Sequence, residues 1–151
     1  MRLNTQKGQS LFEITLALAI STLIIVAIVA LTSNAIRNTT FSKNKSLATH
    51  YSQEATEWLR GQRDADFPTF ETKALTPLYC MPSLSWVTAS IGACASGQEI
   101  PDTIFRREIS FSTSLVNGKT LIQAGVNVYW TDSQGLHEVR SVTNFSDWRE
   151  I

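Results

Sequence analysis

The sequence KGQSLFEITLALAISTLIIVAIVAL, residues 7–31, decides the fold of this chain. Its apolar run, residues 14–31, has eighteen residues and no charge, and its polar members are Thr15, Ser21 and Thr22. At a rise of about 1.5 Å per residue, a helix of this length just crosses a hydrocarbon core of roughly 30 Å. A helix buried in a soluble core would show a polar stripe every three to four residues. Because this run shows none, it predicts a membrane-spanning helix.

A secretory signal peptide is the alternative, with Arg2 and Lys7 as its basic flank. The apolar run exceeds the usual length of roughly seven to fifteen residues, and residues 29–33 (VALTS) make a poor cleavage site. Glu13 at the head of the run is the stronger objection, since a signal peptide gains nothing from an acid there. An acid inside a bilayer costs on the order of 2.5 to 3.5 kcal/mol. Glu13 therefore calls for a cationic partner, unless it lies just outside the span and is solvated.

The register of these residues resembles that of a known family. A basic leader ends in Gly8, Glu13 is the fifth residue after that glycine, and the apolar run follows. This pattern is similar to the N-terminus of type IV pilins and pseudopilins. The resemblance implies cleavage after Gly8 by a prepilin peptidase, which makes residues 1–8 a leader peptide, and N-methylation of the new terminus at Gln9, where family members commonly carry Phe or Met. Residues 9–32 would then stay in the mature protein as a transmembrane and assembly helix.

The resemblance also supplies a partner for Glu13. In a filament of stacked helices, its carboxylate would be neutralised by the amino terminus at Gln9 of a neighbouring subunit, and attraction in low dielectric would set the axial register. The implied partners are the prepilin peptidase, other pilin or pseudopilin subunits, an inner-membrane assembly platform and membrane lipid. The implied location is the inner membrane, crossed once with the head outside the cytoplasm, and then a pilus or pseudopilus filament.

Residues 33–151 are expected to form the extracytoplasmic head, in which the helix continues to about residue 63. Apolar residues recur at helical spacing and would lie against the rest of the head: Leu47, Ala48, Tyr51, Ala55, Trp58 and Leu59. Residues 33–45 are rich in Asn and Thr, which are poor helix formers, so a local break is expected there.

The last third of the chain predicts a sheet over about residues 104–146. Residues 105–115 and 122–130 alternate between apolar and polar, including Thr113 and Leu115 on the expected buried face, and Asn117-Gly118 signals a tight hairpin between them. A second turn at residues 131–135 precedes a third strand with poor alternation. The predicted fold is therefore α+β, a long N-terminal helix packed against a small antiparallel sheet. Residues 105–109, 126–130 and 144–148 resemble PilV-like minor pilins and the I-type pseudopilins of type II secretion.

Cys80 and Cys94 are the two cysteines, too few for a four-thiolate metal site and suited to one disulfide in an oxidising compartment. Residues 68–103 are rich in proline and glycine, which predicts loops and short strands. We call residues 81–93, between the two cysteines, the bridged loop. The apolar residues expected to pack this loop against the sheet are Leu84, Trp86, Val87 and Ile91. Trp86 has a second interpretation, as a surface that stacks on a carbohydrate or a partner.

The composition argues against several kinds of chemistry. Thirteen basic and thirteen acidic residues cancel, so nucleic acid is not an expected partner. His50 and His137 are the histidines, and no motif of a hydrolase or a phosphate-binding loop is present. Asp64 and Asp66 are interpreted as a solvated helix exit rather than cation ligands. We therefore predict no enzyme, no metal and no cofactor.

Two function classes remain open on the sequence. In the first, the chain is a structural subunit, a minor pilin or pseudopilin of a type IV pilus or related filament. In the second, it is a singly anchored extracytoplasmic binding module that does not polymerise. Gly8 together with Glu13 discriminates between them, because a static anchor needs neither a cut site nor an acid at these positions. The sequence does not separate pilus, type II secretion and DNA-uptake systems.

Overall fold

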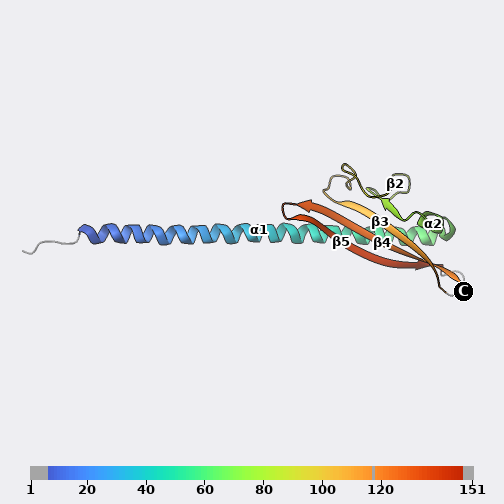
Figure 1. Ribbon diagram of the computed structural model, residues 1–151, viewed down its shortest axis with the longest axis horizontal. Helices are drawn as coiled ribbons and strands as arrows, with labels where there is room; N and C mark the ends of the chain where they lie inside the picture. Colours follow the sequence, from blue (N-terminus) through green and yellow to red (C-terminus); the bar gives the residue numbers. More distant parts are fainter. Residues whose placement is uncertain (1–6, 117, 148–151) are drawn as a thin grey trace, which may run out of the picture. The chain divides into compact units, whose positions relative to one another are not determined.

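The computed structural model of the protein describes residues 7–116 and 118–147, with side chains from residue 11 onward. Of the features expected from the sequence, leader residues 1–6, Asn117 of the hairpin and Trp148 lie outside the described residues. The chain divides into two compact units, Met1–Lys43 and Asn44–Ile151. The first helix, α1 (Lys7–Ala65), has 59 residues and contributes to both (Figure 1).

Helix α1 includes residues 33–45, so the local break expected there is wrong. The threonines in and before this segment explain why. The Thr39 hydroxyl donates to the Ala35 carbonyl at 2.9 Å, and the Thr32 hydroxyl donates to the Ile28 carbonyl at 2.9 Å. A threonine hydroxyl that donates to a carbonyl of the preceding turn is satisfied within a continuous helix. Low intrinsic propensity is therefore not enough to interrupt α1 here.

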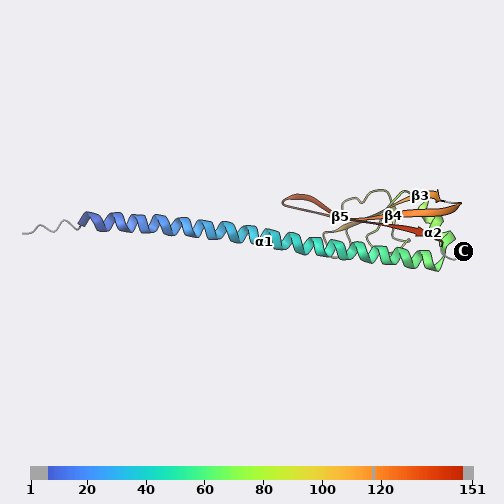
Figure 2. The same cartoon turned by 90° about the horizontal axis from the view of Figure 1, so that it is seen from below.

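In the second unit, the part of α1 from Asn44 to Ala65 lies along one face of the sheet (Figure 2). Ala48, Ala55 and Leu59 are fully buried, as their helical spacing predicts. Ser52 and Thr56 are buried on the same face, and the Thr56 hydroxyl donates to the Ser52 carbonyl at 2.9 Å. Small residues and the internally bonded Thr56 hydroxyl thus let this stretch of α1 approach the strands closely.

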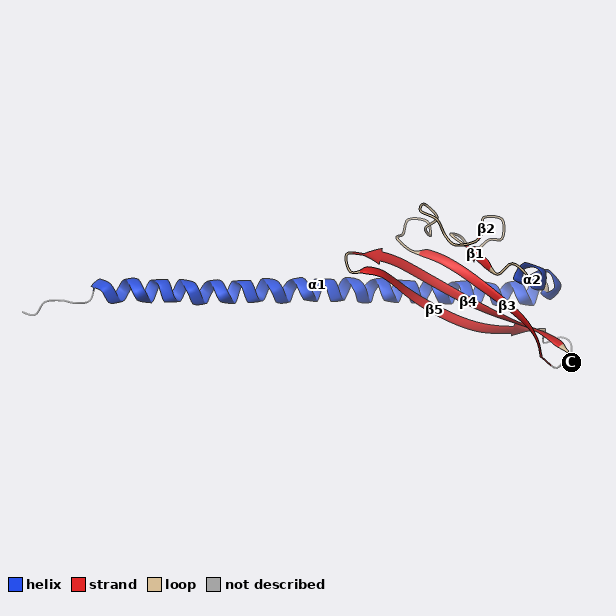
Figure 3. Ribbon diagram, viewed as in Figure 1, coloured by secondary structure: helices blue, strands red, loops and turns tan. Residues whose placement is uncertain are grey.

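The sheet has five strands in the order β2-β1-β3-β4-β5, and every neighbouring pair is antiparallel (Figure 3). The strands are β1 (Leu78–Cys80), β2 (Ser90–Ile91), β3 (Arg106–Val116), β4 (Lys119–Asp132) and β5 (Gly135–Ser146). The alternation predicted β3 and β4, the third long strand was expected after the second turn despite its poor alternation, and the two short strands come from the proline-rich segment. The predicted α+β fold, a long apolar N-terminal helix packed against a small antiparallel sheet, is confirmed.

Both predicted turns join strands through two residues. Val116 pairs with Lys119 at the first turn, where Gly118 has a φ of +77°. Asp132 pairs with Gly135 at the second, and Gly135 has a φ of +117°. Glycine adopts these positive φ values without steric penalty, which explains its place in each turn. The turns fix the register of all three long strands.

The core lies between α1 and the inner face of the sheet. Its large members from the long strands are Ile109, Phe111, Ile122, Val126, Val128, Trp130 and Phe145, and Phe105, directly before β3, is buried with them. The expected burial of Thr113 and Leu115 is wrong, because both are exposed. Pairing of β1 with β3 ends at Ser110, and β3 is exposed from Ser112 to Val116 on both of its faces. Alternation alone does not show how far along β3 the rest of the second unit covers the apolar face.

A second helix, α2 (Phe67–Ala74), occupies part of the segment that the sequence assigned to loops and short strands. Asp66 caps its N-terminus by accepting from the Thr69 backbone N–H at 3.3 Å, and Pro68 lies in the first turn. Proline is favoured there because its fixed φ suits a helix start. Phe70 is buried, with its ring 5.4 Å from that of Phe145. Helix α2 therefore closes one end of the core.

Candidate functional site

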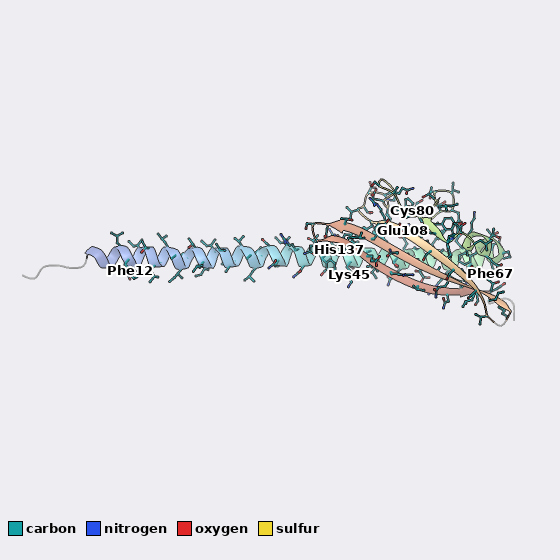
Figure 4. All side chains as sticks on the ribbon, viewed as in Figure 1. Phe12, Lys45, Phe67, Cys80, Glu108 and His137 are labelled. Carbon is teal, nitrogen blue, oxygen red and sulfur yellow. A yellow bond between two sulfur atoms is a disulfide. The ribbon has the colours of Figure 1, made fainter. Side chains whose placement is uncertain are left out.

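The first unit presents the apolar run as an exposed helical surface. Figure 4 shows side chains projecting from α1 on all sides, with Phe12 near its start. Among the described residues, α1 is the one helix long and apolar enough to cross a membrane, and none of its most apolar window is buried. The Thr15 and Thr22 hydroxyls donate to the Phe12 and Ala19 carbonyls at 2.9 and 2.8 Å. Polar groups satisfied within the helix remove an obstacle to insertion in hydrocarbon.

The predicted cut site and assembly residue lie at the beginning of α1. Gly8 and Gln9 are in its first turn, with side chains outside the described ones. Glu13 follows one turn later and is exposed. Within residues 11–116 and 118–147, no ion pair includes Glu13. Cleavage, methylation and the assembly role of Glu13 remain predictions.

Cys80 and Cys94 are joined in a disulfide with a Cα–Cα distance of 4.9 Å, the pairing expected from the sequence. Cys80 belongs to β1, and Cys94 lies in the loop before β3. The Cys94 backbone N–H donates to Glu108 Oε1 at 2.8 Å, and the Met81 N–H donates to the Arg107 carbonyl at 2.9 Å. The disulfide and these two bonds hold both ends of the bridged loop against β3.

Only some residues of the bridged loop pack against the rest of the second unit. Trp86 is half-buried, its Nε1–H donates to Gln62 Oε1 at 2.8 Å, and its ring centroid lies 4.9 Å from that of Trp58. These contacts favour the core interpretation of Trp86 over the stacking surface. Val87 and Ile91 are 93% and 78% exposed, so their expected burial is wrong. Ile91 belongs to an edge strand and Val87 to a turn, where the sheet gives no cover.

Arg107 is the residue of this region that the sequence did not single out. It lies in the register of Phe105 and Ile109, and its side chain is 2% exposed. Its Nε donates to the Met81 carbonyl at 3.1 Å, Nη1 lies 3.4 Å from Glu54 Oε2, and Nη1 and Nη2 lie 3.5 Å from the Tyr51 and Pro82 carbonyls. Burial lowers the pKa of Arg107, and Glu54 opposes that shift.

This arrangement makes Arg107 a clamp between three segments. Its guanidinium bonds to α1 on one side and to the start of the bridged loop on the other, while its own strand is β3. Arginine remains protonated at neutral pH, so the clamp is a permanent buried cation. The sequence did contain a signal for this burial. Arg107 occupies a position of the alternating strand where an apolar residue is expected, and a solvated arginine would not lie there.

The outer face of the sheet carries a second set of polar contacts. Tyr129 donates to Glu108 Oε1 at 2.8 Å, and burial together with this bond raises the pKa of Tyr129 to about 12. Arg106 donates to Glu99 Oε1 at 2.7 Å, a bond that lowers the pKa of Glu99. Glu99, Arg106 and Tyr129 border a cavity of about 340 Å³, which is also lined by Thr103, Ile104, Trp130 and Thr131.

The remaining candidate groups have structural contacts. His137 Nε2 lies 2.9 Å from Asp132 Oδ1, next to the second turn, and His50 is exposed with its ring against Tyr51. Asp64 accepts from Arg63, while Asp66 caps α2 and has its pKa lowered by the hydrogen bonds from Thr69. In the part of the chain that the structure describes, no group of three or more His, Cys, Asp or Glu residues is placed to hold a metal ion.

Comparisons of this chain with models of protein families, with curated proteins and with solved structures returned no match.

Proposed function

We propose that this chain is a structural subunit, a minor pilin or pseudopilin, of a type IV pilus or a related filament. It is made as a membrane-inserted precursor, cut after Gly8 by a prepilin peptidase and N-methylated at Gln9. Its apolar run crosses the inner membrane once, with the second unit outside the cytoplasm. After cleavage the helix leaves the membrane and enters the filament. The role is architectural rather than catalytic.

The observation that carries the proposal is an acid at the head of an exposed apolar helix. The apolar run has no internal cover, so it needs lipid or other helices around it. Glu13 is exposed at the start of this surface and follows Gly8 by five residues, the spacing of the pilin signal. A membrane anchor alone has no use for that acid, whereas a helix that moves from lipid into a bundle of helices does.

The mechanism couples processing to assembly. A carboxylate moved into an apolar bundle is costly unless an opposite charge meets it. Cutting after Gly8 creates a new amino group at Gln9, which neighbouring copies or other subunits bring close to Glu13. An uncut chain lacks this amine, so it stays in the membrane. The prepilin peptidase, the other subunits and an inner-membrane assembly platform are the partners that this sequence of events requires.

Mass spectrometry of the N-terminus of the purified protein tests the proposal directly. A mature chain that begins with methylated Gln9 is the expected result. An intact Met1 in cells that contain an active prepilin peptidase would refute it and would favour a singly anchored binding module.

Variants at Glu13 test the assembly step separately. Glu13→Ala and Glu13→Leu are expected to be cut normally and to be lost from sheared filaments. Glu57→Gln, which changes an exposed acid on the later part of α1, is the matched control and is expected to assemble normally. Normal filament levels of the Glu13 variants would rule out the charge-neutralisation mechanism.

A further inference from the structure

The two edges of the sheet differ sharply. One edge is β2, a strand of two residues (Ser90–Ile91). The other is β5, a strand of 12 residues (Gly135–Ser146) paired with β4 in unbroken register from end to end. β5 contains no proline and no lysine, and its ladder shows no bulge. Short strands, lysine, proline and bulges are common protections of an edge, and β5 has none of these; its charged residues are Glu138 and Arg140.

An edge strand also presents unused backbone groups. In an antiparallel ladder, every second residue points its N–H and C=O away from the partner strand. Among the described residues β4 is the one strand paired with β5, so alternate residues of β5 offer donors and acceptors along its free side. Such a row is a template for a further strand.

The side chains on the outer face of β5 form a pattern that selects a partner. We call these four alternate residues the outward row: Leu136, Glu138, Arg140 and Val142. Leu136 and Val142 are 67% and 50% exposed, and Glu138 and Arg140 are also exposed. Glu138 accepts one hydrogen bond from Asn127 Nδ2 at 3.0 Å. Within the described residues, neither Glu138 nor Arg140 forms an ion pair.

The Arg140 side chain lies close to the sheet because the residue beneath it, Gly125, has no side chain. Gly125 lies on the neighbouring strand, and a Cβ built there would lie 3.5 Å from Arg140 Nη2 and 2.7 Å from Ser110 Oγ. The guanidinium therefore rests across β4 while its charge remains available at the surface. The outward row thus offers an apolar, an acidic, a basic and an apolar position in sequence.

We propose that the free edge of β5 binds an extended segment of another protein chain as an additional antiparallel strand. That segment carries apolar residues opposite Leu136 and Val142 and, between them, a base opposite Glu138 and an acid opposite Arg140. Backbone bonds along the edge give the affinity, and the outward row gives the register.

The occupant is a different chain rather than a second copy, a choice that rests on the proposed function. β5 itself satisfies the pattern, because antiparallel pairing centred on Val139 would place Glu138 opposite Arg140 and Leu136 opposite Val142. However, β5 runs in the same direction as the part of α1 beside it (Figures 1 and 3). Antiparallel self-pairing would therefore point the two Asn44–Ala65 helices in opposite directions. Copies in the proposed filament repeat in one direction, and a two-fold contact that reverses the helix does not fit such a repeat.

The self-complementary pattern supplies a probe of known sequence. A labelled peptide of residues 134–144 (QGLHEVRSVTN) has no anchor, so it can pair antiparallel with β5 of the full-length protein in detergent micelles. We expect saturable binding, measured by fluorescence anisotropy at peptide concentrations where sedimentation shows a monomer. A peptide with Glu138→Arg and Arg140→Glu would face like charges at both positions and should bind about tenfold more weakly.

A matched protein variant completes the charge exchange. The variant with Glu138→Arg and Arg140→Glu should bind the exchanged peptide about tenfold better than it binds the native peptide. Peptides N-methylated at alternate residues supply the backbone control. Methylation at even positions and methylation at odd positions should differ, since one set faces β5 and the other faces solvent.

Three results would overturn the inference. The first is no binding of the native peptide to a protein whose circular dichroism shows it folded. The second is equal binding of native and exchanged peptides, which would show that the outward row does not set the register. The third is a full-length dimer in detergent that the peptide dissociates, which would assign the edge to a second copy. Because the assay does not depend on N-terminal processing, peptide binding by a protein that keeps Met1 in cells with an active prepilin peptidase would uphold strand addition at β5 and refute the proposed function.

Discussion

Replacing Arg107 with methionine tests what holds the bridged loop to the rest of the second unit. Methionine keeps an unbranched apolar stem of similar length and removes every donor of the guanidinium. The side chain is 2% exposed, so solvent cannot take over the lost bonds. The Met81 carbonyl, which accepts from Nε at 3.1 Å, belongs to a residue that is itself fully buried.

The magnitude follows from the separate contacts. A hydrogen bond from a charged donor to a buried acceptor contributes about 1.5 to 3 kcal/mol. The ion pair adds less than about 1 kcal/mol, because Glu54 is 49% exposed and solvent screens it. Removing a buried cation relieves some desolvation, but the carbonyl of the buried Met81 loses its bond from Nε. We therefore expect Arg107→Met to reduce the free energy of unfolding by about 2 to 4 kcal/mol and Glu54→Gln to reduce it by less than about 1 kcal/mol.

Urea unfolding of the full-length protein in detergent micelles measures both values. Tryptophan fluorescence is the suitable signal, since the Trp58 and Trp86 rings pack 4.9 Å apart within the second unit. Equal losses in the Arg107 and Glu54 variants would show that the ion pair, not the bonds to backbone carbonyls, does the clamping. No loss in Arg107→Met would show that the desolvation of the cation cancels all of its hydrogen bonds.

Three further predictions concern the second unit. Asp66 has a folded pKa below its ordinary value of 3.8, so its stabilising effect is complete above pH 3.8 and is lost as the pH falls through the folded pKa. In an acid titration, Asp66→Asn should therefore lose less of its free energy of unfolding than the native protein does. Replacing Cys80 and Cys94 with alanine should lower the free energy of unfolding by about 3 kcal/mol, and unfolding that is equally easy before and after reduction of the native protein would contradict this. Gly125→Ala should reduce the free energy of unfolding by about 1 kcal/mol, because its Cβ would displace the Ser110 hydroxyl from its bond to the Gly125 carbonyl. A double-mutant cycle should show a smaller reduction when Ser110 is already replaced by alanine.

Much of the fold could be predicted because local patterns determine it. The apolar run, the helical spacing up to Leu59 and the alternation of β3 and β4 each depend on a pattern that the sequence displays directly. Each turn needed only two residues and a glycine with positive φ, which a short motif also shows. Helix α2 was missed although Asp66 and Pro68 are an N-cap and a first-turn residue, because the surrounding prolines suggested loops.

The errors arise where burial depends on a distant segment. Arg107 is buried because carbonyls of α1 and of the bridged loop converge on it; its apolar position in β3 indicates burial, but no pattern within β3 shows which groups it would meet. Leu115 and Val87 are exposed because no element covers them, although each reads as apolar in its own segment. The poor alternation of β5 has a different cause: Leu136 and Val142 lie on its exposed face, whereas His137 and Ser141 lie on its partly buried face.

Glu13 gives the proposed filament a geometric constraint as well as a charge. Gln9 and Glu13 are four residues apart in α1, a separation of about 6 Å along the helix axis at about 1.5 Å per residue. For the amino group at Gln9 of one chain to meet Glu13 of another, two parallel helices must therefore be displaced axially by about that distance, with the flexible Glu13 side chain accommodating a few ångströms either way. Helices in exact register would instead place acid beside acid and repel. The same pair of residues thus opposes unstaggered association and favours a staggered one, which is the arrangement that a growing filament needs.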